Sequence, residues 1–145
     1  MSALADLLGR EEGLRLLVYD DATGRPLRPG SVVVGHPTIG IGRCLDRRGI
    51  TEAEALLLLD NDLAEVRAEV AHALPWSAAL SDTRRTVLQA MAFQMGIAGL
   101  LQVRATRAAA QRGDHAAAAE GMLASAWAKQ TPARAARIAA LMRQG

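Results

Sequence analysis

Residues 12–42 read EGLRLLVYDDATGRPLRPGSVVVGHPTIGIG, and this stretch decides how the rest of the chain is organised. Glu12 stands where a first helix should end, because Gly13 follows it and glycine is a common helix terminator. The apolar run 14–19 then predicts a strand that leads into a turn. We therefore expect residues 14–42 to form a small antiparallel sheet with one long hairpin or loop.

The same stretch carries acidic and hydroxyl side chains that the fold can bring together. Glu12 precedes the predicted strand, Asp20 and Asp21 follow it, and Thr38 opens a second β segment. Two carboxylates that flank a bond are what glycoside hydrolysis requires, since one protonates the leaving oxygen and the other activates water or attacks directly. Taken alone, the aspartates are better explained as turn residues and Thr38 as an ordinary strand residue.

The composition predicts a single, mostly helical domain spanning residues 1–145. Half of the residues are apolar, alanine and leucine dominate, and both are good helix formers. The N-terminus has no basic start typical of a secretory signal, and no apolar run is long enough to span a bilayer. One cysteine, Cys44, excludes an internal disulfide framework and agrees with folding in a reducing compartment.

The charge is uneven along the chain. Residues 1–81 hold 12 acids and 8 bases, a balance of −4, whereas residues 82–145 hold 3 acids and 9 bases, a balance of +6. A basic half suggests an anionic polymer as partner, such as nucleic acid, the bacterial wall or a membrane surface. The alternative is an arginine-rich helical surface that is merely solvated.

Helix signals place the remaining elements. Ser2 can cap a helix that ends near residues 10–12, and Val32–Val34 predict a short β stretch. Thr51 and Glu54 form a capping box for a helix over 51–74, which Pro75 stops. Further helices are expected from Ser81 or Asp82 to an interruption at Gly96 and Gly99, then over 100–112, 114–124, a turn through Trp127, and 132–143 with Thr131 as cap.

These elements predict an α+β fold with two lobes. A small α+β lobe over about 12–50 is joined by the connecting helix 51–74 to an all-helical lobe over about 75–145. We expect residues 1–11 to pack with the helical lobe, and a cleft to lie between the lobes.

The motifs that carry a family resemblance come in two distant blocks, in the right order: EGLRL at 12–16 and TIGIG at 38–42, then RR at 84–85, FQMG at 93–96, Trp127, QTP at 130–132 and RA at 134–135. With them the chain resembles the T-even-type phage lysozymes of glycoside hydrolase family 24. The resemblance covers most of the chain and implies a lysozyme-like fold.

The resemblance implies hydrolysis of the β-1,4 bond between N-acetylmuramic acid and N-acetylglucosamine in peptidoglycan, leading to host cell lysis. Glu12 matches the general acid, which should be desolvated or crowded so that it keeps its proton. Asp21 matches the second catalytic carboxylate, and Thr38 the hydroxyl that helps to hold the attacking water. The family resembles inverting enzymes, which implies carboxylates about 6.5–9.5 Å apart.

Other matched positions suggest contacts with the sugar. Cys44, Phe93, Gln94 and Thr106 fall where the family lines its cleft, although Phe93 on an apolar helix is more often a core residue and Cys44 is equally well a buried structural thiol. The chain also departs from the family. Its segment 22–37 is longer, Gly121 replaces an amide that touches sugar, and Arg43 replaces a histidine; Arg43 could still pair with Asp62 through a guanidinium–carboxylate bridge.

Three alternatives to a muramidase remain. A lytic transglycosylase needs the Glu but not Asp21 and Thr38, a non-catalytic wall-binding or virion module needs none of the three, and an arginine-rich amphipathic C-terminal half could disrupt membranes.

We expect no cofactor and no metal, because His36, His72 and His115 lack ligand-like spacing with one another or with Cys44. We expect no nucleic-acid partner and a monomer. The chain should be made in the bacterial cytoplasm without a signal peptide and reach the wall through a membrane pore or as part of a virion.

Overall fold

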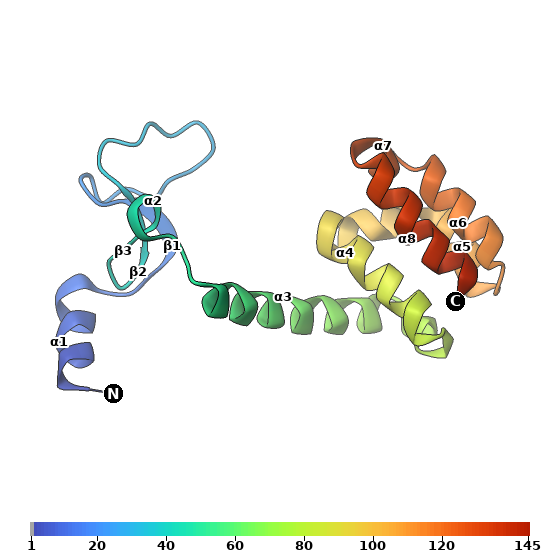
Figure 1. Cartoon of the computed structure of the whole chain (residues 1–145), viewed down its shortest axis with the longest axis horizontal. Coiled ribbons are helices and arrows are strands. Elements are labelled where there is room, and N and C mark those ends of the chain that lie inside the picture. The colour runs from blue at the N-terminus through green and yellow to red at the C-terminus, as the bar shows by residue number, and fades with distance from the viewer. Residues whose placement is uncertain (1) are drawn as a thin grey trace. The chain divides into compact units, whose positions relative to one another are not determined.

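The structure is a computed structural model that describes residues 2–145 (Figure 1). It is mostly helical with one three-stranded antiparallel sheet, which confirms the predicted α+β class. Contacts within the chain divide it into two compact units, Met1–Leu56 and Leu57–Gly145. Helix α1 falls in the first unit; its predicted grouping with the helical lobe stays a prediction.

The N-terminal unit begins with helix α1, Ala3–Glu12. The Ser2 hydroxyl accepts a hydrogen bond from the Ala5 N–H at 3.2 Å, as expected of an N-cap. The helix ends at Gly13, whose φ of 70° favours glycine. Both predicted boundaries of the first helix are confirmed, so Glu12 is its last residue.

The sheet consists of β1 (Arg15–Asp20), β2 (Pro37–Gly40) and β3 (Arg43–Cys44), in the order β1-β2-β3. Thr38 lies opposite Tyr19 on one side and opposite Cys44 on the other. The short helix α2, Leu45–Arg48, follows β3 directly. The predicted antiparallel sheet is confirmed, and Thr38 sits on its middle strand.

The predicted β stretch at Val32–Val34 is wrong, because this segment is irregular. The N–H of Val34 donates to the Asp20 carboxylate at 2.6 Å rather than to a neighbouring strand. A run of three valines has the composition of a strand, but a strand also needs a partner for its backbone groups. Here a side chain supplies that partner.

The capping box at the start of α3, Glu52–Ala73, is confirmed. The Glu54 N–H donates to the Thr51 hydroxyl at 3.2 Å, and the Thr51 N–H donates to the Glu54 carboxylate at 2.8 Å. Arg43 forms its ion pair with Glu54 and donates to the Gly49 carbonyl at 2.9 Å. The capping glutamate therefore takes the Arg43 guanidinium, and the suggested pairing of Arg43 with Asp62, which belongs to the second unit, stays a prediction.

The C-terminal unit continues with a 3-10 turn and five helices: η1 (Pro75–Ala79), α4 (Asp82–Gln102), α5 (Arg104–Gln111), α6 (His115–Ala124), α7 (Ala126–Gln130) and α8 (Pro132–Gln144). Ser81 caps α4, and the helix breaks at Gly96, where φ is 73°. The chain resumes helical structure at once, so Gly99 does not interrupt it and the next helix starts later than expected. Thr131 occupies the cap position of α8 without the expected side-chain hydrogen bond.

The apolar core lies in the C-terminal unit. Its largest fully buried side chains come from α3, α4, α6 and α8 and the segment before η1, namely Val70, Leu74, Val87, Leu88, Met91, Leu100, Met122 and Met142. Small alanines on α5, α6 and α8 let these helices pack closely. Between residues 2 and 145, no single helix is long and apolar enough to cross a bilayer; α4 and α5, bent by 88°, meet that test only as a pair.

Candidate functional site

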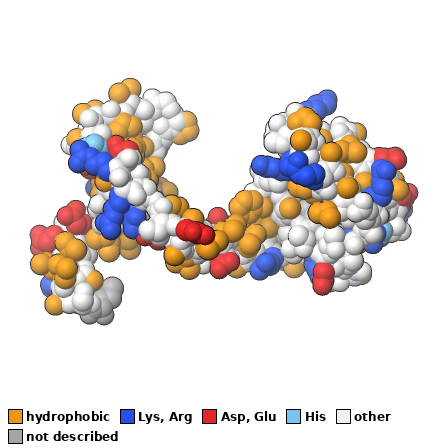
Figure 2. Space-filling view, viewed as in Figure 1, with side chains coloured by type: hydrophobic (Ala, Val, Ile, Leu, Met, Phe, Trp, Pro, Cys, Tyr) orange, Lys and Arg blue, Asp and Glu red, His pale blue; other side chains and the backbone are white. Residues whose placement is uncertain are grey.

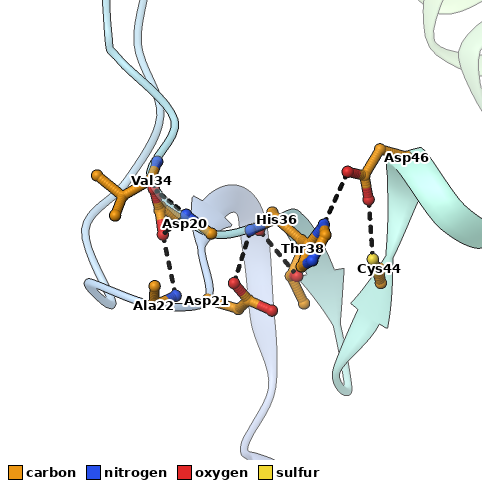
Figure 3. A network of polar contacts seen from close by, with 9 residues as sticks. Asp20, Asp21, Ala22, Val34, His36, Thr38, Cys44 and Asp46 are labelled. Carbon is orange, nitrogen blue, oxygen red and sulfur yellow. Dashed lines mark hydrogen bonds and ion pairs between the residues drawn. The ribbon is translucent and has the colours of Figure 1, made fainter.

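Two adjacent aspartates at the end of β1 have opposite environments (Figure 3). Asp20 is 2% exposed, and its carboxylate accepts hydrogen bonds from the backbone N–H groups of Ala22, Thr23, Val34 and Gly35 at 2.6–3.3 Å. The hydrogen bond from Val34 is the largest of the effects that lower the pKa of Asp20, against a raising effect of burial. Asp20 is therefore an ionised anchor for the segment 22–35.

Asp21 is exposed and held by a single hydrogen bond. Its Oδ1 accepts from the His36 N–H at 2.7 Å, so Oδ2 has no protein partner among the hydrogen bonds of this loop. Gly35 packs directly against it, because a Cβ built on Gly35 would lie 2.2 Å from Asp21 Oδ1 and 2.8 Å from the Ala22 nitrogen. The site thus requires a glycine at position 35 to keep Asp21 where it is.

Thr38 bonds the backbone of the same residue, His36, that bonds Asp21. Its hydroxyl donates to the His36 carbonyl at 3.1 Å, and the residue is only 3% exposed. His36 therefore links both residues through its backbone, with its N–H bonded to Asp21 and its carbonyl bonded to Thr38 (Figure 3). Two of the three predicted catalytic residues are connected in this way.

Glu12 ends α1 with an exposed side chain. A Cβ built on Gly42 would lie 3.0 Å from Glu12 Oε2, so the carboxylate rests against the turn after β2. Gly42 also has a φ of 67°, which side chains rarely adopt. The structure thus seats each of the two predicted carboxylates against a glycine, while the desolvation expected for Glu12 is not met in this structure.

Phe93 and Gln94 are exposed on α4. Phe93 is 46% exposed and lines a groove of about 270 Å³ together with Leu63 and Arg67, so it is not a core residue. Gln94 accepts a hydrogen bond from the Trp127 indole N–H at 2.8 Å, which fixes the orientation of the amide.

Thr106 has no exposed surface and therefore cannot contact a sugar in this structure. It packs between α5 and α6, where a Cβ on Gly121 would lie 2.8 Å from the Thr106 hydroxyl. Its hydroxyl has no hydrogen-bond partner. The helix contact, rather than sugar binding, accounts for both Thr106 and Gly121.

A larger pocket that the sequence did not reveal lies in the C-terminal unit. It has a volume of about 560 Å³ and is walled by the end of α4, the start of α5 and the segment from α6 through α7. Its polar lining groups include Gln102, Arg104 and Gln130, beside the indole of Trp127. The residues that line the pocket run from Met95 to Gln130, which is why no local motif predicted it.

Cys44 is half-buried and belongs to a cluster that sequence spacing did not predict. Its thiol donates to Asp46 Oδ1 at 2.9 Å, and His36 Nδ1 pairs with Asp46 Oδ2 at 2.8 Å. The hydrogen bond with Asp46, followed by burial, raises the pKa of Cys44. Hydrogen bonds from Cys44 and His36 in turn lower the pKa of Asp46.

Several arginines of the basic C-terminal half are used within the fold. Arg84 donates to the carbonyls of Met142 and Arg143, and Arg107 donates to the Leu101 carbonyl. Arg85 forms an ion pair with Asp82. These arginines therefore make contacts within the helical unit.

Comparison with known proteins gives two matches. The family described as phage lysozyme matches residues 9–144. The chain is also 31% identical over 160 residues to the pre-baseplate central spike protein Gp5 of Enterobacteria phage T4, a match that covers 99% of this chain. The chain spans only 28% of that relative's length.

Proposed function

Since the chain belongs to the phage lysozyme family, we propose that it is a muramidase that cuts the β-1,4 bond between N-acetylmuramic acid and N-acetylglucosamine in peptidoglycan. The observation that carries this proposal is the linked arrangement of Asp21, His36 and Thr38 in a family member that also retains Glu12. A pure wall-binding module has no need of this set.

In the proposed reaction Glu12 donates its proton to the oxygen that leaves as the bond breaks. Its side chain is exposed in this structure. A glycan laid over the end of α1 would exclude water from the carboxyl group and so favour its neutral form. We therefore propose that the bound substrate, and not the protein alone, excludes water from the Glu12 carboxyl group.

Asp21 and Thr38 handle the attacking water. The free Oδ2 of Asp21 accepts a proton from the water, while the hydrogen bond from His36 keeps Oδ1 in place. Thr38 is too buried to contact a sugar ring, but its oxygen can accept a hydrogen bond from a water molecule. This division of roles corresponds to inversion at the anomeric carbon.

The sugar contacts that we propose are Phe93 and Gln94, and Cys44 at the edge of the sheet. Phe93 offers an exposed apolar face, and Gln94 offers a fixed amide. Thr106 is left out, because it has no surface that a ligand can reach.

The first test is mass spectrometry of the soluble products from purified peptidoglycan. Products with reducing-end muramic acid are expected, and Glu12→Gln should lower their rate of release by about 10²- to 10⁴-fold. Glu11→Gln is the matched control, since Glu11 is the exposed neighbour on the same helix and should leave the rate nearly unchanged. Anhydro-muramic products would mean a transglycosylase, and a folded chain that releases nothing would sink the enzymatic proposal.

A second test addresses the position of Asp21 without changing its chemistry. Gly35→Ala introduces a methyl group where Asp21 Oδ1 now lies, so the carboxylate must move and the rate should fall by about tenfold or more. Gly9→Ala is the control, because nothing lies within 4 Å of a Cβ there. An unchanged rate in Gly35→Ala would remove Asp21 from the proposed mechanism.

We further propose that the activity is used from the virion, at the cell wall. The support is the likeness to a central spike protein of a phage particle. An antibody against the chain should then detect it in purified particles. Detection only in the soluble fraction of lysed cells would favour a free endolysin instead.

A further inference from the structure

Three side chains with different metal-binding atoms converge in the N-terminal unit. The ligand atoms of His36, Cys44 and Asp46 all lie within 4.8 Å of one another. Over residues 2–145 this is the one such group of His, Cys, Asp or Glu that the structure forms. We propose that it is a binding site for a zinc-class divalent metal ion.

The backbone explains why these side chains meet. Thr38 lies opposite Cys44 in the β2–β3 ladder, and His36 precedes Thr38 by two residues. Side chains two apart on a strand, or directly opposite across a ladder, project to the same face of a sheet. Helix α2 begins right after Cys44 and brings Asp46 to that face (Figure 3). The sheet and helix thus position all three ligands.

The spacing suits a tetrahedral ion. Zinc bonds of about 2.0–2.3 Å to nitrogen, oxygen and sulfur imply ligand atoms about 3.3–3.7 Å apart. The two hydrogen-bonded pairs are closer, with His36 Nδ1 at 2.8 Å and Cys44 Sγ at 2.9 Å from the Asp46 oxygens, and the remaining separations stay within 4.8 Å. A small rotation of Asp46 would exchange its two hydrogen bonds for bonds to the ion. The thiol would release its proton to solvent, and the proton on His36 Nδ1 would be given up so that the imidazole binds with Nδ1 and keeps a proton on Nε2.

The donor set selects the metal. A thiolate, an imidazole and a single carboxylate favour zinc and related borderline ions, whereas magnesium and calcium require mostly oxygen ligands. Three protein ligands leave the fourth position to water. Because the His36 backbone also bonds Asp21 and Thr38, an ion at this site would brace the loop that carries both.

The test is a titration of the untagged full chain with Zn²⁺ by calorimetry and with Co²⁺ by visible absorption. One ion per chain is expected, with a thiolate-to-cobalt charge-transfer band that Cys44→Ser abolishes. His36→Gln and Asp46→Asn should each weaken zinc binding by about tenfold or more. His72→Gln is the matched control, since His72 is exposed on α3 outside the cluster and should leave the affinity unchanged.

A measurement on the unaltered chain guards against variants that fail to fold. Zinc should slow the alkylation of Cys44 by iodoacetamide and raise the midpoint of thermal unfolding, since a ligand that binds only the folded state stabilises it. An alkylation rate that zinc does not change would overturn the proposal. Zinc binding that persists at full strength in a folded Cys44→Ser variant would do the same.

Discussion

The two units of this chain are stabilised by different physical means. In residues 2–56 the buried residues are Asp20 and Thr38, both polar, and no apolar side chain is fully buried. In Leu57–Gly145 a cluster of leucines, valines, methionines and alanines is almost completely removed from water. Buried hydrogen bonds stabilise the first unit, whereas packing of apolar side chains stabilises the second.

The contrast extends to the surface. Most of the large exposed apolar side chains belong to the first 59 residues, among them Leu4, Leu14, Leu16, Leu17 and Val32. Figure 2 shows hydrophobic side chains lying open over the surface of α1. Hydrogen bonds add about 1 kcal/mol each on balance, whereas burial of one large side chain adds about 1.5–3 kcal/mol. The unit with the candidate catalytic carboxylates is therefore the less stable one by its own contacts.

Cutting the chain gives the largest expected effect. A fragment of residues 57–145 should fold alone and unfold cooperatively on heating, because it contains the whole buried core. A fragment of residues 1–56 should show little fixed structure, since domains of this size need a core of their own. Circular dichroism of both fragments checks this, and a cooperative melt of the shorter one would break the comparison.

Core truncation comes next. Leu88→Ala should lower the free energy of unfolding by about 2–5 kcal/mol, because Leu88 is fully buried on α4. Leu16→Ala, at a side chain that is 78% exposed on β1, should change it by about 0.5 kcal/mol or less. Chemical denaturation measures both. A large loss in Leu16→Ala would mean that β1 is covered in solution.

Two glycine-to-alanine substitutions, one in each unit, should change the free energy of unfolding in opposite directions. Gly121→Ala should destabilise the chain by about 1–3 kcal/mol, because the added methyl group would lie 2.8 Å from the Thr106 hydroxyl and 3.1 Å from its nitrogen. Gly9→Ala in α1 meets open space and should stabilise by up to about 1 kcal/mol.

Thermal unfolding of both glycine variants is the measurement. Adding Thr106→Ala to Gly121→Ala should recover part of the loss, since it removes the nearest atom. Equal costs in the single and double variants would show that the hydroxyl is not what the methyl group meets.

The smallest expected effect is a loss of stability of the N-terminal unit at acidic pH. The pKa values of Asp20, Asp46 and Glu54 are all lowered in the folded chain, by backbone or side-chain hydrogen bonds to their carboxylates. A lowered pKa contributes stability that is present above the ordinary values of about 3.9 and 4.3, and is lost as the pH falls through the folded-state pKa. The N-terminal unit should therefore loosen below about pH 4, before the helical unit does.

Nuclear magnetic resonance separates the two units in this titration. The Tyr19 ring reports on the sheet, and the Trp127 indole N–H reports on the helices. Asp20→Asn should be less stable at neutral pH and less sensitive to acid. Loss of the Trp127 signal before that of Tyr19 would reverse the predicted order.

Local signals in the sequence predicted most of the fold. The caps at Ser2 and Ser81, the capping box at Thr51 and the glycine breaks at Gly13 and Gly96 were all read correctly, because each is decided within a few residues. The strand prediction for Val32–Val34 failed because the Val34 N–H bonds the Asp20 carboxylate, 14 residues away in sequence, and not a neighbouring strand.

The candidate site was less predictable for the same reason. The adjacent carboxylates of Asp20 and Asp21 look alike in sequence, and they differ only in which backbone amides of the folded loop bond to each of them. The cluster of His36, Cys44 and Asp46 depends on strand register, and the burial of Thr106 depends on how closely two helices pack. In each of these cases the environment of the side chain depends on how close two distant segments of the chain lie, and residue types alone do not give that distance.

The carboxylate of Asp20 has one consequence for how such chains can diversify. It accepts hydrogen bonds from Ala22 at the start of the segment after β1 and from Val34 at its end, and the Leu27 N–H bonds the Val18 carbonyl. The two ends of the loop 28–33 are therefore held in place. Lengthening a closed loop costs little free energy, because the cost grows only with the logarithm of its length. New sequence can therefore be inserted at this tip without moving Asp21 or Thr38.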